Sequence, residues 1–223
     1  MAVAAVIFDF DGVLANTEQL HLRAIQDALA TLGRSLEQRD YVERFLGYGD
    51  RDVFVEVARE HGWALDDVAL QSLMTVKADR YRHHLTAGSA LFATAAPCVR
   101  RLAERFPLAI ASGSLHGEIH DILTAAGLRD PFRSIVGADD VTAGKPAPDS
   151  YLKAAELIGV APAHAVAIED SRWGLESARA AGMRTIGITT TYGASALTLA
   201  NLVVGSLDEI TVKVIEGLQS PRT

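Results

Sequence analysis

Two pairs of carboxylates in this sequence are spaced so that each pair could act at one site. Asp9 and Asp11 flank a phenylalanine directly after an apolar run, and Glu169 and Asp170 follow a second apolar run. Residues two apart on an extended chain point the same way, so the side chains of Asp9 and Asp11 can converge. Taken alone, an Asp-x-Asp pattern is equally consistent with two solvated loop residues, and a Glu-Asp pair with a helix cap.

Hydroxyl groups, free amides and one lysine offer the opposite chemistry, the binding of an anion. Ser112, Gly113 and Ser114 follow an apolar run and precede a helical pattern, which places hydroxyls and backbone N–H groups near a helix N-terminus. Lys145 lies in Gly-Lys-Pro-Ala-Pro, where two prolines stiffen the loop that holds it. A lone Gly-Lys-Pro is more often only a turn.

The elements that position these groups are short apolar runs, continuous rather than alternating. They are Val3–Phe8, Leu108–Ala111, Ile135–Val136, Ala165–Ile168, Thr185–Ile188 and Leu202–Val204. Continuous burial is typical of parallel strands covered on both faces. Helical patterns separate most of the runs, at Ala95–Phe106, Leu115–Ala126, Asp149–Ile158, Gly174–Ala181 and Leu207–Glu216. This alternation predicts a doubly wound, Rossmann-like α/β fold with a parallel sheet.

The polar groups follow four of the predicted strands. Ligands of open α/β sheets bind outside the carboxyl ends of the strands, where these groups would meet. Four polar clusters at four strand ends are hard to attribute to chance, and we expect a single site there.

One long stretch interrupts the alternation of strand and helix. Between Thr17 and about Gly88 the sequence contains only amphipathic helical patterns, at Glu18–Leu32, Arg39–Phe45, Arg51–His61 and Asp67–Leu85. We therefore expect an α/β core domain made of residues 1–16 and 89–223, and an inserted all-helical cap domain made of residues 17–88.

Composition excludes several classes of protein. Of the 223 residues, 49% are apolar, which a disordered chain would not have. The net charge of −7 argues against a nucleic acid or an anionic membrane as partner. The sequence has no apolar segment long enough to span a bilayer, and its single cysteine, Cys98, fits a reducing compartment. The opening apolar run is short and has no basic region before it, so we do not expect it to be a signal peptide. We expect a cytoplasmic protein; a monomer is compatible with the sequence, which does not specify an oligomeric state.

The polar motifs resemble those of the haloacid dehalogenase superfamily. Asp9-Phe-Asp-Gly-Val-Leu with Thr17, Gly144-Lys-Pro-Ala-Pro-Asp149 and Ile168-Glu-Asp-Ser171 are similar to the β-phosphoglucomutase and small sugar-phosphatase branch. The match extends from about Val3 to Leu207, and the helical insertion lies where that branch carries its helical cap.

The resemblance implies an aspartyl-phosphate mechanism that depends on Mg²⁺. Asp9 would be the nucleophile, and Asp11 would protonate the leaving oxygen and then take a proton from the attacking water or hydroxyl. The metal ligands would be the Asp9 carboxylate, the Asp11 backbone carbonyl and Asp170, with Glu169 either a direct ligand or one step removed from the metal.

The same resemblance assigns the groups that bind the phosphate. Ser112 and the amide of Gly113 would hold the phosphoryl oxygens, and Lys145 would balance the charge of the phosphate and of Asp9. Haloacid dehalogenases lack a carboxylate two residues after the nucleophile, because halide needs no proton to leave. The presence of Asp11 therefore favours phosphate-ester chemistry.

Candidate substrate-binding residues in the cap are His21, Arg51 and Lys77. His21 resembles a histidine of β-phosphoglucomutases and sugar phosphatases, Arg51 lies near the mutase position that grips a distal phosphate, and Lys77 matches a mutase cap lysine in relative spacing. The alternatives are a solvated or helix-packing role for His21 and a solvated helical face for Lys77. The loop before Arg51 departs from the mutase pattern, which leaves its register open.

These observations predict a Mg²⁺-dependent phosphatase of a small phosphorylated metabolite, with a sugar phosphate as the expected substrate. A phosphomutase of the β-phosphoglucomutase kind is the alternative, because it uses the same intermediate. A binding module that has kept the fold without activity is a third hypothesis, against which the intact set of Asp9, Asp11, Lys145 and Asp170 argues.

Overall fold

The computed structural model describes residues 2–45, 48–84 and 90–218, which divide into two compact units. An α/β unit consists of Met1–Asn16 and Leu91–Thr223, and a helical unit consists of Thr17–Ala90. The boundary expected between residues 88 and 89 lies outside the described residues.

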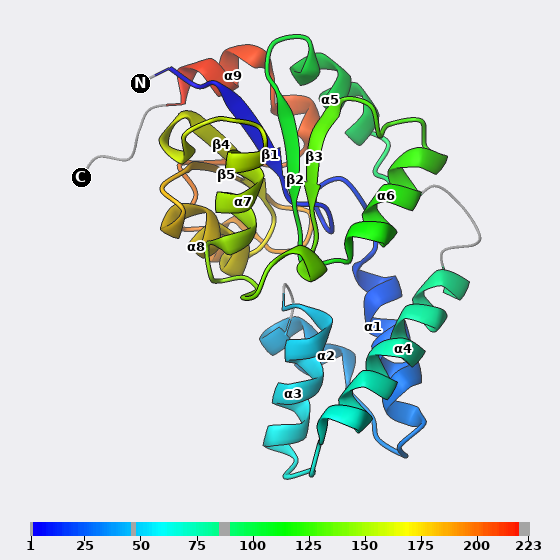
Figure 1. Cartoon of the computed structure of the whole chain (residues 1–223). Coiled ribbons are helices and arrows are strands. Elements are labelled where there is room, and N and C mark those ends of the chain that lie inside the picture. Colours follow the sequence, from blue (N-terminus) through cyan, green and yellow to red (C-terminus); the bar gives the residue numbers. More distant parts are fainter. Residues whose placement is uncertain (1, 46–47, 85–89, 219–223) are drawn as a thin grey trace. The chain divides into compact units, whose positions relative to one another are not determined.

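The α/β unit is built on a six-stranded parallel sheet in the order β3-β2-β1-β4-β5-β6 (Figure 1). The strands are β1 Ala5–Phe8, β2 Leu108–Ala111, β3 Phe132–Val136, β4 Ala165–Glu169, β5 Arg184–Ile188 and β6 Leu202–Val204. In the central register Phe8 lies opposite Ile110 of β2 and Ile168 of β4. Because β1, β2 and β4 are buried along their whole length, they read in the sequence as unbroken apolar runs.

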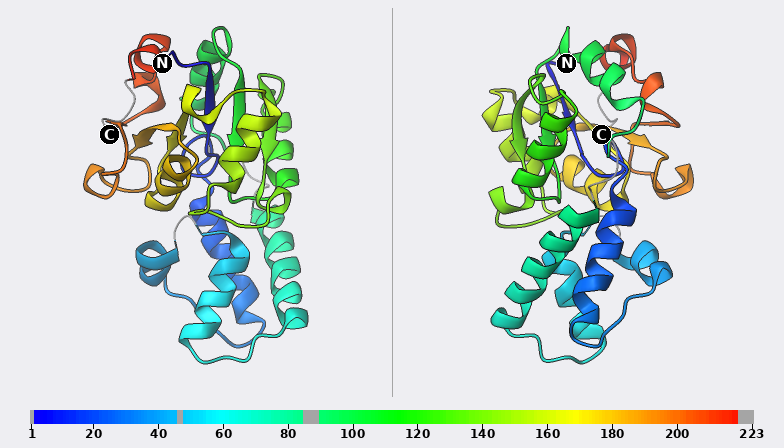
Figure 2. Two further views of the ribbon diagram at one scale, coloured as in Figure 1. Left: turned by 60° about the vertical axis from the view of Figure 1, so that its left-hand side comes forward. Right: turned by 90° about the vertical axis from the view of Figure 1, so that its right-hand side faces the viewer.

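Helices cover both faces of this sheet (Figures 1 and 2). They are α5 Ala95–Ala103, α6 His116–Ala125, α7 Asp149–Leu157, α8 Arg172–Ala180 and α9 Val212–Gly217. Small residues let α7 and α8 approach the strands closely, since Ala154 and Ala178 pack in one cluster with Ala109 and Ala167. The predicted doubly wound fold is confirmed.

The predicted helix Leu207–Glu216 is wrong in one respect. The structure contains a 3₁₀ turn at Leu207–Glu209 followed by α9, with a break between them. The break arises because the Thr211 hydroxyl accepts a hydrogen bond from the Val214 amide at 3.2 Å and so starts a new helix.

The helical unit contains α1 Glu18–Ala30, α2 Gln38–Asp40, a π-helical turn Tyr41–Phe45, α3 Asp50–Glu60 and α4 Asp67–His84. Helix α1 packs along α4, and its buried positions follow a helical period through Leu22, Ile25 and Leu29. The described part of this unit contains no strand. Leu85, the expected last residue of the final helix, lies outside the described residues.

None of the helices in the described ranges is long and apolar enough to cross a membrane. Cys98 is buried in α5, and burial raises the pKa of its thiol to about 11. The thiol is therefore protonated at neutral pH and is not a nucleophile there.

Candidate active site

The loop that carries Asp9 and Asp11 leaves the carboxyl end of β1. The Asp9 amide continues the strand pairing by donating to the Ile168 carbonyl at 2.9 Å, and Gly12 then turns the chain with a φ of +73°. A Cβ atom at Gly12 would lie 1.9 Å from Oδ2 of Asp170. Only glycine therefore allows the loop to pass this close to the second carboxylate pair. The Thr190 hydroxyl, which follows β5, donates to the Gly12 carbonyl and holds the loop.

Lys145 joins the two carboxylate-bearing strand ends. Its Nζ lies 2.8 Å from Oδ1 of Asp9 and 2.6 Å from Oε1 of Glu169, and all three residues are buried. Burial alone would lower the pKa of Lys145, but Asp9 and Glu169 raise it above its ordinary value. The lysine is therefore charged, as the balancing of an anion requires.

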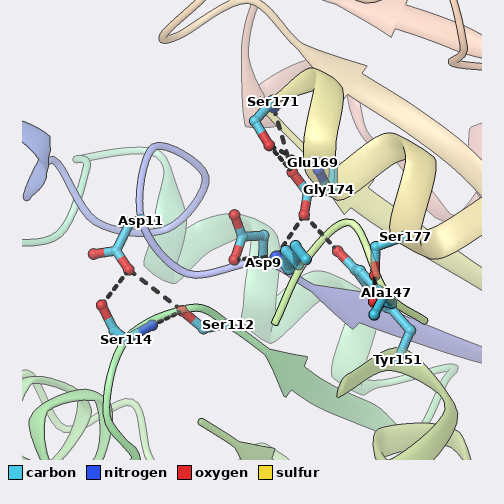
Figure 3. A network of polar contacts seen from close by, with 11 residues as sticks. Asp9, Asp11, Ser112, Ser114, Ala147, Tyr151, Glu169, Ser171, Gly174 and Ser177 are labelled. Atoms are coloured by element: carbon cyan, nitrogen blue, oxygen red, sulfur yellow. Dashed lines mark hydrogen bonds and ion pairs between the residues drawn. The ribbon is translucent and has the colours of Figure 1, made fainter. Parts of the chain in front are cut away.

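Glu169 receives hydrogen bonds on both of its oxygens (Figure 3). Lys145 and the Tyr151 hydroxyl, at 2.8 Å, donate to Oε1, and the Ser171 hydroxyl donates to Oε2 at 3.1 Å. Burial raises the pKa of Tyr151, and Glu169 raises it further, so the phenol keeps its proton and acts as the donor. Sequence reasoning missed Tyr151, because nothing in a helical pattern indicates which residue of α7 faces the strand ends.

Asp11 points toward Ser112 and Ser114, which follow β2 (Figure 3). Its Oδ2 accepts hydrogen bonds from the Ser114 hydroxyl at 2.6 Å and the Ser112 hydroxyl at 3.3 Å. The two aspartates of the first loop therefore have different neighbours, a lysine for Asp9 and two hydroxyls for Asp11. Gly113 lies between the two serines in the loop.

The residues of this edge fit a divalent cation. Carboxylate oxygens of Asp9, Glu169 and Asp170 lie within 4.8 Å of one another, and all three side chains are buried. Burial raises the pKa of Asp9, and the nearby charge of Glu169 raises it further. Lys145 supplies a single positive charge against these three carboxylates. A divalent cation held by hard oxygen ligands would offset the remaining negative charge.

The structure brings two of the three cap candidates together inside the helical unit. Nζ of Lys77 lies 2.9 Å from Nδ1 of His21 and 2.6 Å from Oδ2 of Asp50. The ring of Tyr81 lies 4.3 Å from the His21 ring and 4.5 Å from the Lys77 ammonium, by centroid. Lys77 is only 1% exposed, so the interpretation of Lys77 as part of a solvated helical face is wrong.

The pairing in this cluster determines the protonation of its members. Because the Lys77 ammonium can only donate, Nδ1 of His21 is the acceptor and the ring proton lies on Nε2. Burial alone would raise the pKa of Asp50, but the neighbouring Lys77 ammonium, the strongest opposing influence, lowers it to about 2. Arg51, the third candidate, is exposed on α3. Substrate binding by His21, Arg51 and Lys77 stays a prediction.

Comparisons with known proteins identify the family of this chain. A family model described as haloacid dehalogenase-like hydrolase matches residues 6–188. Protein CbbY from Rhodobacter capsulatus is 34% identical over 200 residues, which cover 86% of this chain and 88% of that protein. The fructose-1-phosphate phosphatase YqaB from Escherichia coli K12 is 30% identical over 196 residues, 83% of this chain and 96% of that protein.

Among solved structures, a CbbY variant from Rhodobacter sphaeroides in complex with xylulose-1,5-bisphosphate matches with a TM-score of 0.83 and 27% identity. The match covers 93% of this chain and 96% of that chain. The family expected from the sequence motifs is confirmed by the match over residues 6–188 and by the relatives above 30% identity. The chain belongs to the haloacid dehalogenase-like hydrolases.

Proposed function

We propose that this phosphoric monoester hydrolase removes the phosphoryl group of a small sugar or polyol phosphate, with Mg²⁺ and through an aspartyl-phosphate on Asp9. The observation that carries the proposal is Lys145, buried between Asp9 and Glu169 at the carboxyl edge of the sheet. An ammonium held 2.8 Å from Asp9 offsets the repulsion that a dianionic phosphate would meet from the carboxylate.

The proposed reaction has two displacements at phosphorus. In the first, a carboxylate oxygen of Asp9 forms a bond to phosphorus as the bond to the alcohol oxygen breaks, and Asp11 gives its proton to that oxygen. In the second, Asp11 takes a proton from water, which attacks phosphorus, releases phosphate and restores the Asp9 carboxylate. The Ser114 hydroxyl, which donates to Oδ2 of Asp11 at 2.6 Å, would keep this carboxyl group aimed at the leaving oxygen. The Gly113 amide and the Ser112 hydroxyl would bind phosphoryl oxygens.

The metal would be held by the carboxylates of Asp9 and Asp170 and by the backbone carbonyl of Asp11. When bound, Mg²⁺ would reduce the repulsion between the phosphate and the carboxylates of the site. The crowding of three buried carboxylates around one lysine supports this assignment.

The names of two related proteins support a sugar or polyol phosphate as the substrate. One relative is a fructose-1-phosphate phosphatase, and a matching structure of CbbY contains xylulose-1,5-bisphosphate. Both molecules are short, hydroxylated and phosphorylated on an alcohol oxygen.

A panel of phosphorylated sugars, polyols and small organic acids, assayed for Mg²⁺-dependent release of phosphate, tests the proposal. We expect hydrolysis of one or a few sugar or polyol phosphates and loss of activity on removal of Mg²⁺ by a chelator. No phosphate release from any member would contradict the proposal and revive a role in binding alone. Conversion of β-glucose 1-phosphate to the 6-phosphate without free phosphate, given a trace of the bisphosphate, would instead identify a phosphomutase.

A further inference from the structure

Glu169 is held more tightly than a simple metal ligand would need. Its two oxygens accept from Lys145, Tyr151 and Ser171, including the Ser171 amide at 3.3 Å. The first turn of α8 closes over the carboxylate, because a Cβ atom at Gly174 would lie 1.8 Å from Oε1 and 2.1 Å from Oε2. The carboxylate therefore has no room to turn away from its donors.

Tyr151 contacts the lysine of the site in two ways (Figure 3). Its hydroxyl donates to the same Oε1 atom of Glu169 that accepts from Lys145, at 2.8 Å and 2.6 Å respectively. Its ring centroid lies 5.1 Å from Nζ of Lys145, within the range of a cation–π contact. Tyr151 is fully buried in α7, so both contacts are made by a side chain with one packed orientation.

We propose that Tyr151 is a positioning residue for the phosphoryl transfer, acting through Glu169 on Lys145. This inference rests on the proposed function. By donating to Oε1, the tyrosine hydroxyl takes up part of the negative charge that would otherwise hold the ammonium at Glu169. Lys145 then stays shared with Asp9, where it can follow the charge that develops on the phosphoryl group.

The substitution Tyr151→Phe removes the hydroxyl and keeps the ring. We expect kcat to fall about tenfold, the loss of one hydrogen bond to a charged group. We expect KM to stay unchanged, because the fully buried Tyr151 would act through Glu169 and Lys145 rather than on the substrate itself. The matched control is Ser150→Ala. Ser150 is the buried neighbour of Tyr151 on α7, and within the described part of the chain its Oγ has no hydrogen-bond partner. Equal kcat values for the two variants would overturn the proposal.

A double-mutant cycle tests whether the effect passes through Glu169. In a Glu169→Gln background, which already weakens the hold on Lys145, we expect Tyr151→Phe to have little further effect on kcat. The same tenfold loss in both backgrounds would mean that Tyr151 acts by another route, and would overturn the proposal.

A spectroscopic measurement keeps this inference separate from the proposed function. The lysines of the chain are Lys77, Lys145, Lys153 and Lys213, so lysine-selective ¹⁵N labelling gives a small set of ammonium signals. The signal of Lys145 is identified by its loss in Lys145→Arg. We expect Tyr151→Phe to shift this signal and leave the others in place, and Ser150→Ala to shift none. An unshifted Lys145 signal would overturn the inference even in an active enzyme, whereas an inactive wild-type protein with the expected shift would contradict only the proposed function.

Discussion

The α/β unit and the helical unit each bury a lysine beside a carboxylate and a tyrosine ring, but the two clusters differ in charge. In the helical unit, Lys77 faces the single carboxylate of Asp50 and the neutral ring of His21, so the charges cancel. These side chains come from α4, α3 and α1, and their contacts tie the three helices together.

The cluster of the α/β unit is not balanced in this way. Lys145 stands against Asp9 and Glu169, with Asp170 close by. A folded chain that left this excess negative charge buried would be destabilised unless a cation completed the site. The comparison teaches that burial and ion pairing are common to both clusters, and that an excess of buried negative charge distinguishes the cluster for which we propose a reaction.

The largest expected effect comes from removing the proposed nucleophile. Asp9→Asn should lower the rate of phosphate release from a generic aryl phosphate by at least about a thousandfold, because no covalent intermediate can form. The measurement is phosphate release under saturating Mg²⁺, with the fold checked by circular dichroism. The control Asp121→Asn makes the same chemical change at an exposed side chain and should keep full activity. Substantial activity in Asp9→Asn would contradict the mechanism.

Breaking the cluster of Lys77, Asp50 and His21 should lower the stability of the helical unit. Lys77→Met leaves the carboxylate of Asp50 buried without its main partner, and we expect the free energy of unfolding of the helical unit to fall by about 3 to 5 kcal/mol. Urea unfolding followed by Trp63 fluorescence in a Trp173→Phe background reports on this unit. Lys213→Met, at an exposed lysine of α9, is the control. If Lys77→Met lowered the free energy of unfolding no more than Lys213→Met, the Lys77–Asp50 pair would contribute little to stability.

Adding Mg²⁺ should distinguish the two clusters, because only the cluster of the α/β unit is expected to bind it. At a concentration about 100 times its dissociation constant, Mg²⁺ should raise the free energy of unfolding of the α/β unit by about 2.7 kcal/mol. Trp173 fluorescence in a Trp63→Phe background follows this unit. Asp170→Asn should remove the effect, and Asp121→Asn should retain it. Equal stabilisation of wild type and Asp170→Asn would place the metal elsewhere.

The smallest expected effect is the loss of stability when Asp50, the carboxylate of the cluster in the helical unit, is protonated at low pH. The pKa of Asp50 is lowered to about 2 in the folded chain, against 3.8 for the ordinary group. A lowered folded pKa contributes stability at pH values above 3.8 that is lost as the pH falls through about 2, here about 2 kcal/mol. The difference in free energy of unfolding between wild type and Asp50→Asn, followed by Trp63 fluorescence, should shrink by about 2 kcal/mol as the pH falls from above 3.8 through about 2. A difference that stays constant down to pH 2 would contradict the lowered pKa.

Much of the fold could be predicted because its signals are local. Strands β1, β2 and β4 are buried on both faces, so their apolar character appears in the sequence without knowledge of their neighbours. The carboxyl ends of parallel strands share one edge, so the placement of Asp9, Lys145 and Glu169 near one another followed from topology.

The sequence by itself therefore determined the fold class, the family and the edge of the sheet at which the candidate site lies. The tertiary structure decided which atoms meet. At the sheet edge Asp11 accepts from Ser114 and Tyr151 donates to Glu169, and in the helical unit Asp50 pairs with Lys77. These partners are 18 or more positions apart along the chain. A hydrogen bond depends on a few tenths of an ångström in the packing of separate elements, and neither hydrophobic period nor motif spacing carries that information.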